Sequence, residues 1–328
     1  MGVHLNMREK VAVLMSVYNA EKYLKTCIDS VLNQSYANFL FYIINDNSTD
    51  SSLTIIKSYS DSRIRLIENE INIGLTKSLN KALSQISTEY IARIDADDIC
   101  EPSRFSSQLA VLEEDDENLA LVGSSAILIN ETSIYVGEIN APIANLKENL
   151  FFKNSFIHST IMVRTEVLKK YKYDEQIKYA QDYNLWVKIA QDYKVANIKD
   201  KLIKYRIHGA SLSFRKKKEQ DACVLPTINY QLKSLGILND VERAKFAKLH
   251  LQYFVLNTET YSFKDRLDLF LYFKKIVKLN KRKEIYNEYF NKKLIKIIKK
   301  EKGILIYSLK RFILLKVGFK LVKRESNE

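Results

Sequence analysis

Apolar segments alternate with amphipathic segments over the first hundred residues, and this alternation restricts the fold more than any other feature of the sequence. Residues 11–18, 39–45, 63–67 and 90–94 are rich in β-branched and aromatic side chains, as buried strands are. The intervening segments, such as 20–34, carry apolar residues at helical spacing. Strand and helix patterns in alternation predict a parallel sheet with helices on both faces.

Three carboxylates follow directly on the last of these strands. The segment "YIARIDADDI" places Asp95, Asp97 and Asp98 at the carboxyl end of strand 90–94. In a low-dielectric setting, carboxylates this close repel one another unless one is protonated or a cation lies between them. A second polar cluster, "NDNSTD" at 45–50, follows strand 39–45. Ligands of open α/β sheets bind beyond the carboxyl ends of the strands, so both clusters mark a predicted ligand site that also holds a positive charge.

Common nucleotide-binding fingerprints are missing from the sequence. It contains neither G-x-G-x-x-G nor the P-loop pattern G-x-x-x-x-G-K. This argues against an NAD enzyme and against a kinase-type NTPase, because both use glycine-rich loops to approach phosphates. A phosphate in this protein is therefore expected to be held by a metal ion.

Charge divides the chain into two parts. Residues 1–210 hold 24 Lys and Arg against 27 Asp and Glu, whereas residues 211–328 hold 28 against 12. We therefore expect a near-neutral catalytic domain over 1–210 and a basic, helical C-terminal region over 211–328 that meets a polyanionic surface.

Three interpretations of the basic region remain open at this point. It lies on an anionic membrane, binds nucleic acid, or is a solvated helical appendage that packs on the core or forms a dimer. Lysine-rich helices interleaved with Leu, Phe and Tyr favour the membrane, and no recognised nucleic-acid module accompanies the charge. Three widely spaced cysteines and the absence of a long apolar segment predict a cytoplasmic protein, peripheral on the inner face of the cell membrane.

Five motifs in order give a resemblance to a known family. They are "SVYNAEKYLKTCIDSVLNQSY", "INDNSTD", "NIGLTKSLNKAL", "YIARIDADD" and "QDYNLW", spread over residues 8–210. The chain thereby resembles a family-two glycosyltransferase of the GT-A fold, from the group that builds bacterial surface polysaccharides. The resemblance implies a Rossmann-like, mostly parallel sheet flanked by helices, a C-terminal helical extension, and a metal-dependent, inverting hexosyltransferase.

The resemblance also assigns roles to the acidic loop. Asp95 would meet the ribose of a nucleotide-sugar donor. Asp97 would ligate Mg²⁺ or Mn²⁺ bridging the diphosphate, with His208 as a further ligand. One or two carboxylates plus substrate phosphates suffice for Mg²⁺. The simpler alternatives are a solvated Asp-rich loop that caps the next helix and a structural histidine.

A uridine pocket is implied at the first polar cluster. There Asp46 would accept a hydrogen bond from N3–H of the base. Val17 and Tyr18 would flank the base, and Asn72 or Lys77 would close the nucleotide pocket. The simpler alternative, a helix N-cap made by the same segment, is compatible with this role.

The general base implied by the resemblance is Asp182. Gln181 and Asp182 stand where the family has a Glu-Asp pair before a Leu-Trp-type helix. An inverting transfer needs one carboxylate to take the proton of the attacking hydroxyl. The alternative is an aspartate stabilised by the helix dipole. His158 matches a position near the acceptor, where a pocket wall and a catalytic role are equally open.

The expected function is transfer of a sugar from a nucleotide donor, a UDP-sugar by preference, to a hydroxyl of a glycan or lipid-linked acceptor. Two other classes are compatible with parts of the pattern. A metal-dependent nucleotidyltransferase also combines an α/β fold with acidic metal ligands, and it would need a second metal-holding carboxylate. A catalytically inert protein that binds nucleotide sugars or membranes would not need Asp97 and Asp182.

Overall fold

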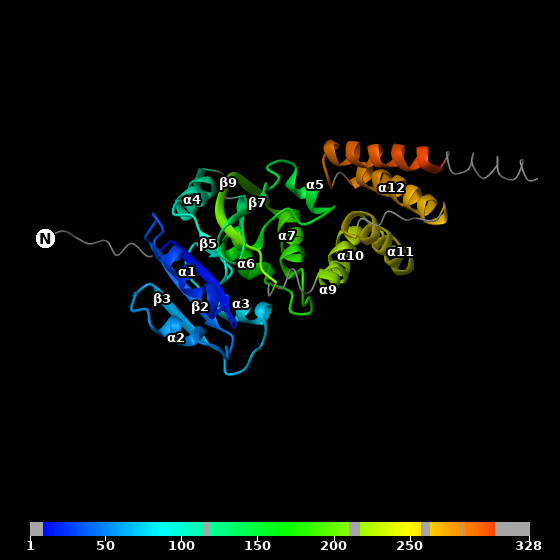
Figure 1. The fold of residues 1–328 in the computed structure, drawn as a ribbon. Coiled ribbons are helices and arrows are strands. Elements are labelled where there is room, and N and C mark those ends of the chain that lie inside the picture. The colour runs from blue at the N-terminus through cyan, green and yellow to red at the C-terminus, as the bar shows by residue number, and fades with distance from the viewer. Residues whose placement is uncertain (1–8, 115–117, 210–216, 257–262, 284, 306–328) are drawn as a thin grey trace, which may run out of the picture. The chain divides into compact units, whose positions relative to one another are not determined.

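A computed structural model describes residues 9–114, 118–209, 217–256, 263–283 and 285–305 (Figure 1). The chain forms two compact units, of which the first comprises Met1–Leu150 with Asn154–Val224 and the second Phe151–Lys153 with Leu225–Glu328. The domain boundary expected at 210/211 falls beside residues 210–216, which lie outside the described residues.

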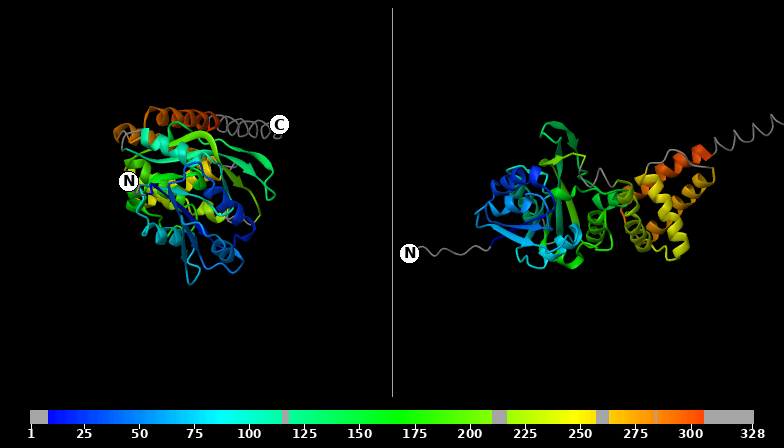
Figure 2. Two further views of the ribbon diagram at one scale, coloured as in Figure 1. Left: turned by 90° about the vertical axis from the view of Figure 1, so that its left-hand side faces the viewer. Right: turned by 60° about the horizontal axis from the view of Figure 1, so that its bottom comes forward.

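The first unit is an α/β unit, coloured blue to green in Figures 1 and 2. Its strands are β1 Val11–Val17, β2 Phe39–Asn45, β3 Ile64–Glu68, β4 Tyr90–Arg93, β5 Ile99–Cys100, β6 Leu119–Ile129, β7 Tyr135–Ile139, β8 Met162–Arg164 and β9 Lys194–Arg206. Its helices are α1 Glu21–Leu32, α2 Ser52–Lys57, α3 Leu75–Leu83, α4 Arg104–Glu114, α5 Leu146–Leu150, α6 Thr165–Tyr171, α7 Gln181–Asp192 and α9 Lys217–Ala222, with a 3₁₀ turn η1 at His158–Thr160.

The strands form one nine-stranded sheet in the order β3-β2-β1-β4-β8-β6-β9-β5, with β7 paired to β6. The four strands predicted over the first hundred residues, β3, β2, β1 and β4, pair in parallel. Beyond β4 the sheet becomes mixed: β8 runs antiparallel to β4 and β6, and β9 runs parallel to β6. The expected α/β architecture is confirmed. Strands that the sequence predicts around 119–122, 127–129 and 161–163 are present in β6 and β8, but the pattern alone did not indicate their antiparallel pairing.

Burial explains why the first half folds as it does. Alternate residues of β1, among them Val11, Val13 and Met15, are fully buried in the main hydrophobic core. Helix α1 completes this core with its apolar stripe, including Leu24 and Ile28. Because β1, β2 and β4 are parallel neighbours, their carboxyl ends reach the same edge of the sheet.

The second unit is helical, with α10 Leu225–Ser234, α11 Asp240–His250, a π-helical turn at Leu251–Val255, α12 Phe263–Lys283 and a further helical segment at 288–305 (yellow to red in Figure 1). Its core is aromatic: the Phe151 ring lies 4.9 Å from His250 and 5.0 Å from Phe290. His250 is fully buried and shares a 2.8 Å hydrogen bond with the Tyr272 hydroxyl. Among the described helices, none is both long and apolar enough to cross a bilayer.

Candidate active site

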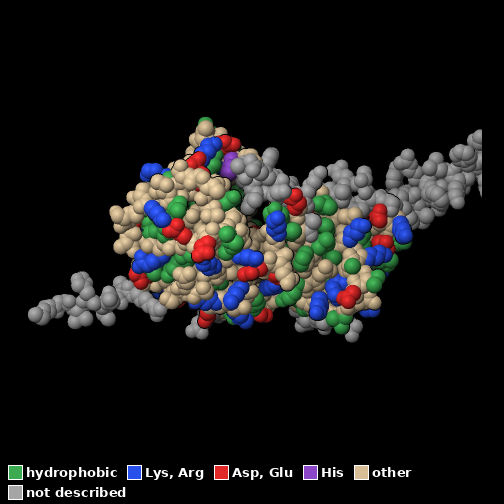
Figure 3. Space-filling view, turned by 90° about the horizontal axis from the view of Figure 1, so that it is seen from below, with side chains coloured by type: hydrophobic (Ala, Val, Ile, Leu, Met, Phe, Trp, Pro, Cys, Tyr) green, Lys and Arg blue, Asp and Glu red, His purple; other side chains and the backbone are tan. Residues whose placement is uncertain are grey.

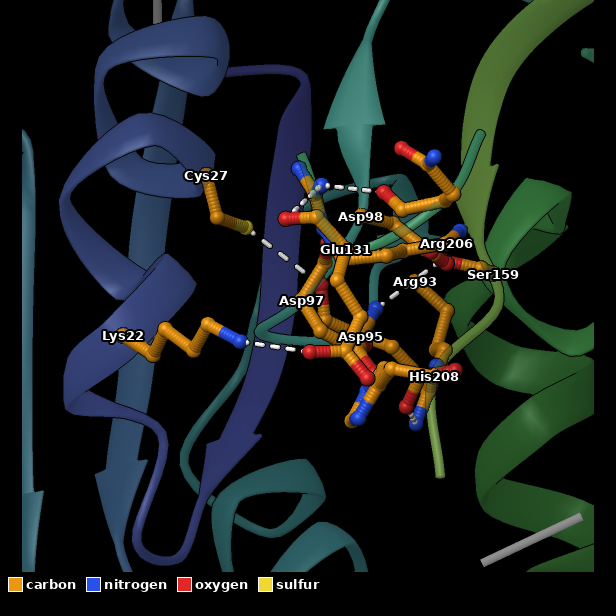
Figure 4. A network of polar contacts seen from close by, with 11 residues as sticks. Lys22, Cys27, Arg93, Asp95, Asp97, Asp98, Glu131, Ser159, Arg206 and His208 are labelled. Carbon is orange, nitrogen blue, oxygen red and sulfur yellow. Dashed lines mark hydrogen bonds and ion pairs between the residues drawn. The ribbon is translucent and has the colours of Figure 1, made fainter. Parts of the chain in front are cut away.

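The acidic loop after β4 holds three carboxylates in different environments (Figure 4). Asp98 is buried, whereas the side chains of Asp95 and Asp97 retain 35% and 27% exposure. The turn is closed by the Asp98 backbone N–H, which donates to the Asp95 carbonyl at 3.3 Å. The Asp95 N–H in turn donates to the Ser159 hydroxyl of η1 at 2.9 Å. Two of the three carboxylates therefore remain open to a ligand.

Arg93 supplies one of the positive charges that the sequence predicts for this loop. Its guanidinium is buried and forms an ion pair with Asp95. Burial acts to raise the pKa of Asp95, but the charge and hydrogen bond of Arg93 outweigh it and lower the pKa. Asp95 is consequently held as an anion. The same guanidinium also acts to lower the pKa of Asp182, so Arg93 couples electrostatically to both carboxylates.

Arg206, the last residue of β9, fixes the other side of the loop. Its backbone N–H donates to Asp98 Oδ1 at 2.8 Å, and its Nε donates to the Asp97 carbonyl at 2.9 Å. The guanidinium also donates to the Asn130 carbonyl at 2.9 Å and lies 4.4 Å from the centre of the Tyr23 ring. Arg206 thus ties the loop to β9 and to the turn after β6.

Asp98 is the carboxylate that the surroundings favour in its neutral form. Burial raises its pKa well above the usual aspartate value, and the charges of Asp97 and Asp95 raise it further. Among the described residues its Oδ2 atom is buried with no hydrogen-bond partner, whereas Oδ1 accepts from Arg206. The crowding of the three carboxylates therefore favours the uncharged form of Asp98, and Arg93 offsets the charge of Asp95.

The two residues predicted to hold a metal lie side by side. His208 Nε2 and Asp97 Oδ2 are 2.8 Å apart, and the Tyr23 ring lies 5.1 Å from the His208 ring. Within the described residues, no group of three or more His, Cys, Asp or Glu is placed to hold a metal. One carboxylate and one imidazole fit an ion that takes its remaining ligands from a diphosphate and water.

At the end of β2, the Asp46 carboxylate is buried and already accepts protein hydrogen bonds. Its Oδ1 accepts from Asn69 Nδ2 at 2.8 Å and from the Ile73 N–H at 2.9 Å. Its Oδ2 accepts from the N–H of Gly74 at 2.8 Å; Gly74 has φ +86°, a conformation that favours glycine. Of roughly four acceptor sites on a carboxylate, about one is left for a ligand.

The other residues predicted for the nucleotide pocket surround Asp46 in part. The Asp46 N–H donates to the Val17 carbonyl at 2.8 Å, and Asn72 Nδ2 donates to the Asp46 carbonyl at 3.2 Å. Val17 is fully buried, whereas Tyr18 is 52% exposed at the end of β1. Lys77 is exposed on α3. The structure thus brings Val17 and Asn72 directly to Asp46, while Tyr18 and Lys77 contribute exposed side chains.

Asp182 lies in the first turn of α7, half-buried. Its Oδ2 accepts a 2.9 Å hydrogen bond from Asn154. Burial raises the pKa of Asp182, and this effect outweighs the hydrogen bonds from the Tyr183 N–H and from Asn154, which act to lower it. A carboxylate with a raised pKa is a stronger base than an ordinary one, which suits proton abstraction.

His158 takes a structural place beside this helix. Its Nε2 shares a 2.9 Å hydrogen bond with the Tyr173 hydroxyl, and its ring lies 6.0 Å from Trp186. Burial lowers the pKa of His158 well below its ordinary value, an effect that the Arg93 charge reinforces. A neutral imidazole packed among aromatic rings corresponds to the pocket-wall alternative.

Several residues of the site were missed by sequence reasoning. Arg93 carried a signal, since a charged residue in an otherwise apolar strand needs a partner. Asn69 and Asn154 carried none, because their partners are distant in sequence. The ion pair between Lys22 and Glu131, at 2.7 Å, which joins α1 to the turn after β6, is equally invisible to local patterns.

Comparison with known proteins adds independent findings. The model of glycosyl transferase family 2 matches residues 12–172. An uncharacterized glycosyltransferase of Methanocaldococcus jannaschii is 36% identical over 270 residues, which cover 79% of this chain and 93% of that protein. The O-antigen biosynthesis glycosyltransferase WbnJ of Escherichia coli is 32% identical, covering 63% of this chain and 83% of the relative.

A further relative and a solved structure agree. The E. coli UDP-Glc:alpha-D-GlcNAc-diphosphoundecaprenol beta-1,3-glucosyltransferase WfgD is 32% identical, with 64% of this chain and 81% of WfgD covered. The structure of S. aureus TarS 1-349 in complex with UDP-GlcNAc superposes with a TM-score of 0.60 at 17% identity, over 83% of each chain. The sequence relatives indicate the family and the superposition indicates the fold: this chain belongs to the family-2 glycosyltransferases and has the GT-A fold.

Proposed function

We propose that this glycosyltransferase moves a sugar from a UDP-sugar, with inversion at the anomeric carbon, to a hydroxyl of a glycan or lipid-linked acceptor in cell-surface polysaccharide synthesis. The carrying observation is the juxtaposition at one sheet edge of Asp97 and His208, which face each other, with Asp95, which Arg93 keeps ionised. The relatives named for O-antigen synthesis and for an undecaprenyl-linked acceptor support this substrate class. Family membership favours this reading over a nucleotidyltransferase.

The residues after β2 and those after β4 would bind different parts of the donor. The residues around Asp46 would receive the uracil, with Val17 and Tyr18 flanking the base and Asn72 and Lys77 closing the pocket. Asp95 would accept hydrogen bonds from the ribose, since its ion pair with Arg93 leaves the side chain partly exposed. The complexes of TarS with UDP and UDP-GlcNAc support a uridine donor.

Asp97 and His208 would hold Mg²⁺ or Mn²⁺ against the diphosphate. Such an ion neutralises charge that develops on the departing nucleoside diphosphate. The Arg206 contacts to Asp98 Oδ1 and to the Asp97 carbonyl keep the loop in place.

Asp182 would accept the proton of the acceptor hydroxyl as that oxygen attacks the anomeric carbon. Asn154 orients the carboxylate through Oδ2. Arg93, which acts electrostatically on Asp95 and Asp182, links the donor side to the base.

The proposal is tested by incubating the protein with a set of UDP-sugars and Mn²⁺ and by following transfer or slow donor hydrolysis. Asp182→Asn should lower turnover by about 10²–10⁴-fold, the usual contribution of a general base, with UDP affinity unchanged. Full activity of this variant would remove Asp182 from the mechanism. NMR of the product decides inversion, and retention of the anomeric configuration would contradict the proposal.

The pH profile gives a second test of the same role. A general base works when it is deprotonated, so kcat should fall as the pH drops through the pKa of Asp182. Because burial raises this pKa, the fall should begin at a higher pH than for an ordinary aspartate. Asp182→Glu should keep the fall of kcat at low pH, and Asp182→Asn should abolish it.

We propose further that residues 1–210 form the catalytic domain and that the basic region 211–328 holds the protein on the inner, cytoplasmic face of an anionic membrane. The charge of the C-terminal region and its lysine-rich helices support this location. Nucleic acid is not an expected partner.

A further inference from the structure

The exposed side chains of α12 form one stripe. Where side chains of α12 are described, the exposed ones alternate at intervals of three and four residues, which places them on one face of a helix. Leu269, Tyr272 and Phe273 are fully buried on the opposite face. The stripe consists of Lys264, Leu267, Leu271, Lys274, Lys278 and Lys281.

Among the described residues, the α12 stripe holds four lysines and no acidic side chain. None of its four lysines forms an ion pair with another described residue. Asp268, on the flank of the helix, is already paired with Lys245 at 2.8 Å. Lysines that lie unpaired on one face favour an external anionic partner.

The leucines distinguish the stripe from an ordinary solvated face. Leu267 is 41% exposed and Leu271 is 52% exposed, one turn apart on the same line as the lysines. Apolar side chains between cations match the boundary of a lipid bilayer, where acyl chains and headgroup phosphates lie next to each other. A nucleic-acid backbone would use the lysines and leave the leucines in water.

The helical segment 288–305 also exposes several lysines. Among its described residues the exposed ones include Lys292, Lys296 and Lys299, and the exposed acid Glu288 is paired with Lys292 at 3.1 Å. Glu301 is buried and paired with Arg266 at 3.0 Å. Figure 3 shows another face of the molecule, on which Lys and Arg are interspersed with Asp and Glu and with hydrophobic side chains.

We infer that the α12 stripe is the surface by which this protein lies on an anionic membrane. The leucines enter the headgroup and acyl boundary, and the lysines contact lipid phosphates. This inference rests on the membrane association proposed above and names the face responsible. It is independent of the donor chemistry, because α12 belongs wholly to the second unit.

The test measures binding of the full chain to vesicles of mixed phosphatidylglycerol and phosphatidylcholine, and to vesicles of phosphatidylcholine alone. Wild type should sediment with the first and not with the second. K278Q/K281Q should bind about 30-fold more weakly, at roughly fivefold for each lysine neutralised near the surface. L267S/L271S should also bind more weakly, by loss of apolar insertion.

The matched control is K233Q/K248Q, which removes the same charge from exposed lysines of α10 and α11. This control should bind as wild type, and circular dichroism verifies that every variant is folded. Equal binding by wild type and both stripe variants would overturn the stripe while leaving membrane association in place. A control as weak as K278Q/K281Q would likewise overturn the stripe, because only total charge would then matter.

Two further outcomes separate this inference from the other proposals. Failure of wild type to bind phosphatidylglycerol vesicles would overturn both the stripe and membrane association, while donor hydrolysis would still report on the transferase. Tighter binding to a DNA duplex than to these vesicles at the same salt concentration would overturn the assignment of a lipid partner.

Discussion

The carboxyl ends of β2 and β4 both present aspartates to the same edge of the sheet, yet they stabilise them in opposite ways. Asp46, after β2, is buried and held by three neutral N–H donors. The aspartates after β4 crowd together: the buried Arg93 pairs with Asp95, burial raises the pKa of Asp98, and His208 contacts Asp97. The first arrangement leaves about one acceptor position of Asp46 for a ligand, whereas the second leaves the partly exposed carboxylates of Asp95 and Asp97.

This difference suggests a division of labour. A neutral base needs a pocket of fixed shape, and the hydrogen bonds of Asp46 provide rigidity. A diphosphate with its metal ion needs carboxylates that can exchange partners. Substitutions at the two strand ends can be compared by their effect on the free energy of unfolding. Removing a residue that offsets an internal charge should lower this free energy most, and removing a residue that only contacts a ligand should lower it least.

The largest effect on stability is expected for Arg93→Met. The variant leaves Asp95 without the cation that faces it. Because the Asp95 side chain keeps 35% exposure, the loss should lie toward the lower end of the about 3–5 kcal/mol that breaking a fully buried ion pair costs. Urea denaturation measures this change. Arg93→Lys is the control, since it retains the charge and should lose less; equal losses would show that packing of the guanidinium, and not its charge, matters.

An intermediate effect is expected for Asp46→Ala. The variant leaves the buried amide of Asn69 and the N–H groups of Ile73 and Gly74 without an acceptor, and unsatisfied buried groups cost about 1–3 kcal/mol each before water or relaxation compensates. We expect a loss of about 2–3 kcal/mol in denaturation experiments. Unchanged stability would mean that the hydrogen bonds of the Asp46 carboxylate do not stabilise the fold.

The smallest effect on stability is expected for Asp97→Asn. The side chain is partly exposed, and such substitutions change the free energy of unfolding by about 0.5 kcal/mol or less. Calorimetry with UDP and Mn²⁺ should nevertheless show that the metal no longer strengthens UDP binding. If Mn²⁺ strengthens UDP binding in this variant as in wild type, Asp97 is not a ligand, and the contrast between the two strand ends fails.

Much of the site's outline could be predicted from local patterns. The strand 39–45 was predicted with its observed bounds, and the strands before Tyr18 and Asp95 end within one residue of the predicted positions. Parallel strands deliver their carboxyl ends to one edge, so the proximity of the polar clusters followed from the order of elements. Local patterns could not predict which residues bind the aspartates. Arg206, for example, donates a hydrogen bond to Asp98, which lies more than a hundred residues earlier in the sequence.

The sequence by itself determined the α/β class, the positions of the acidic clusters and the concentration of positive charge in the last third, because periodicity, turn chemistry and net charge are properties of neighbouring residues. Only the tertiary structure decided which aspartate is satisfied by N–H donors, which is paired with arginine and which has its pKa raised by burial. It also decided that the exposed residues of α12 fall on one lysine and leucine stripe. The physical reason is that burial and hydrogen-bond partners depend on contacts between residues distant in sequence, which no local pattern encodes.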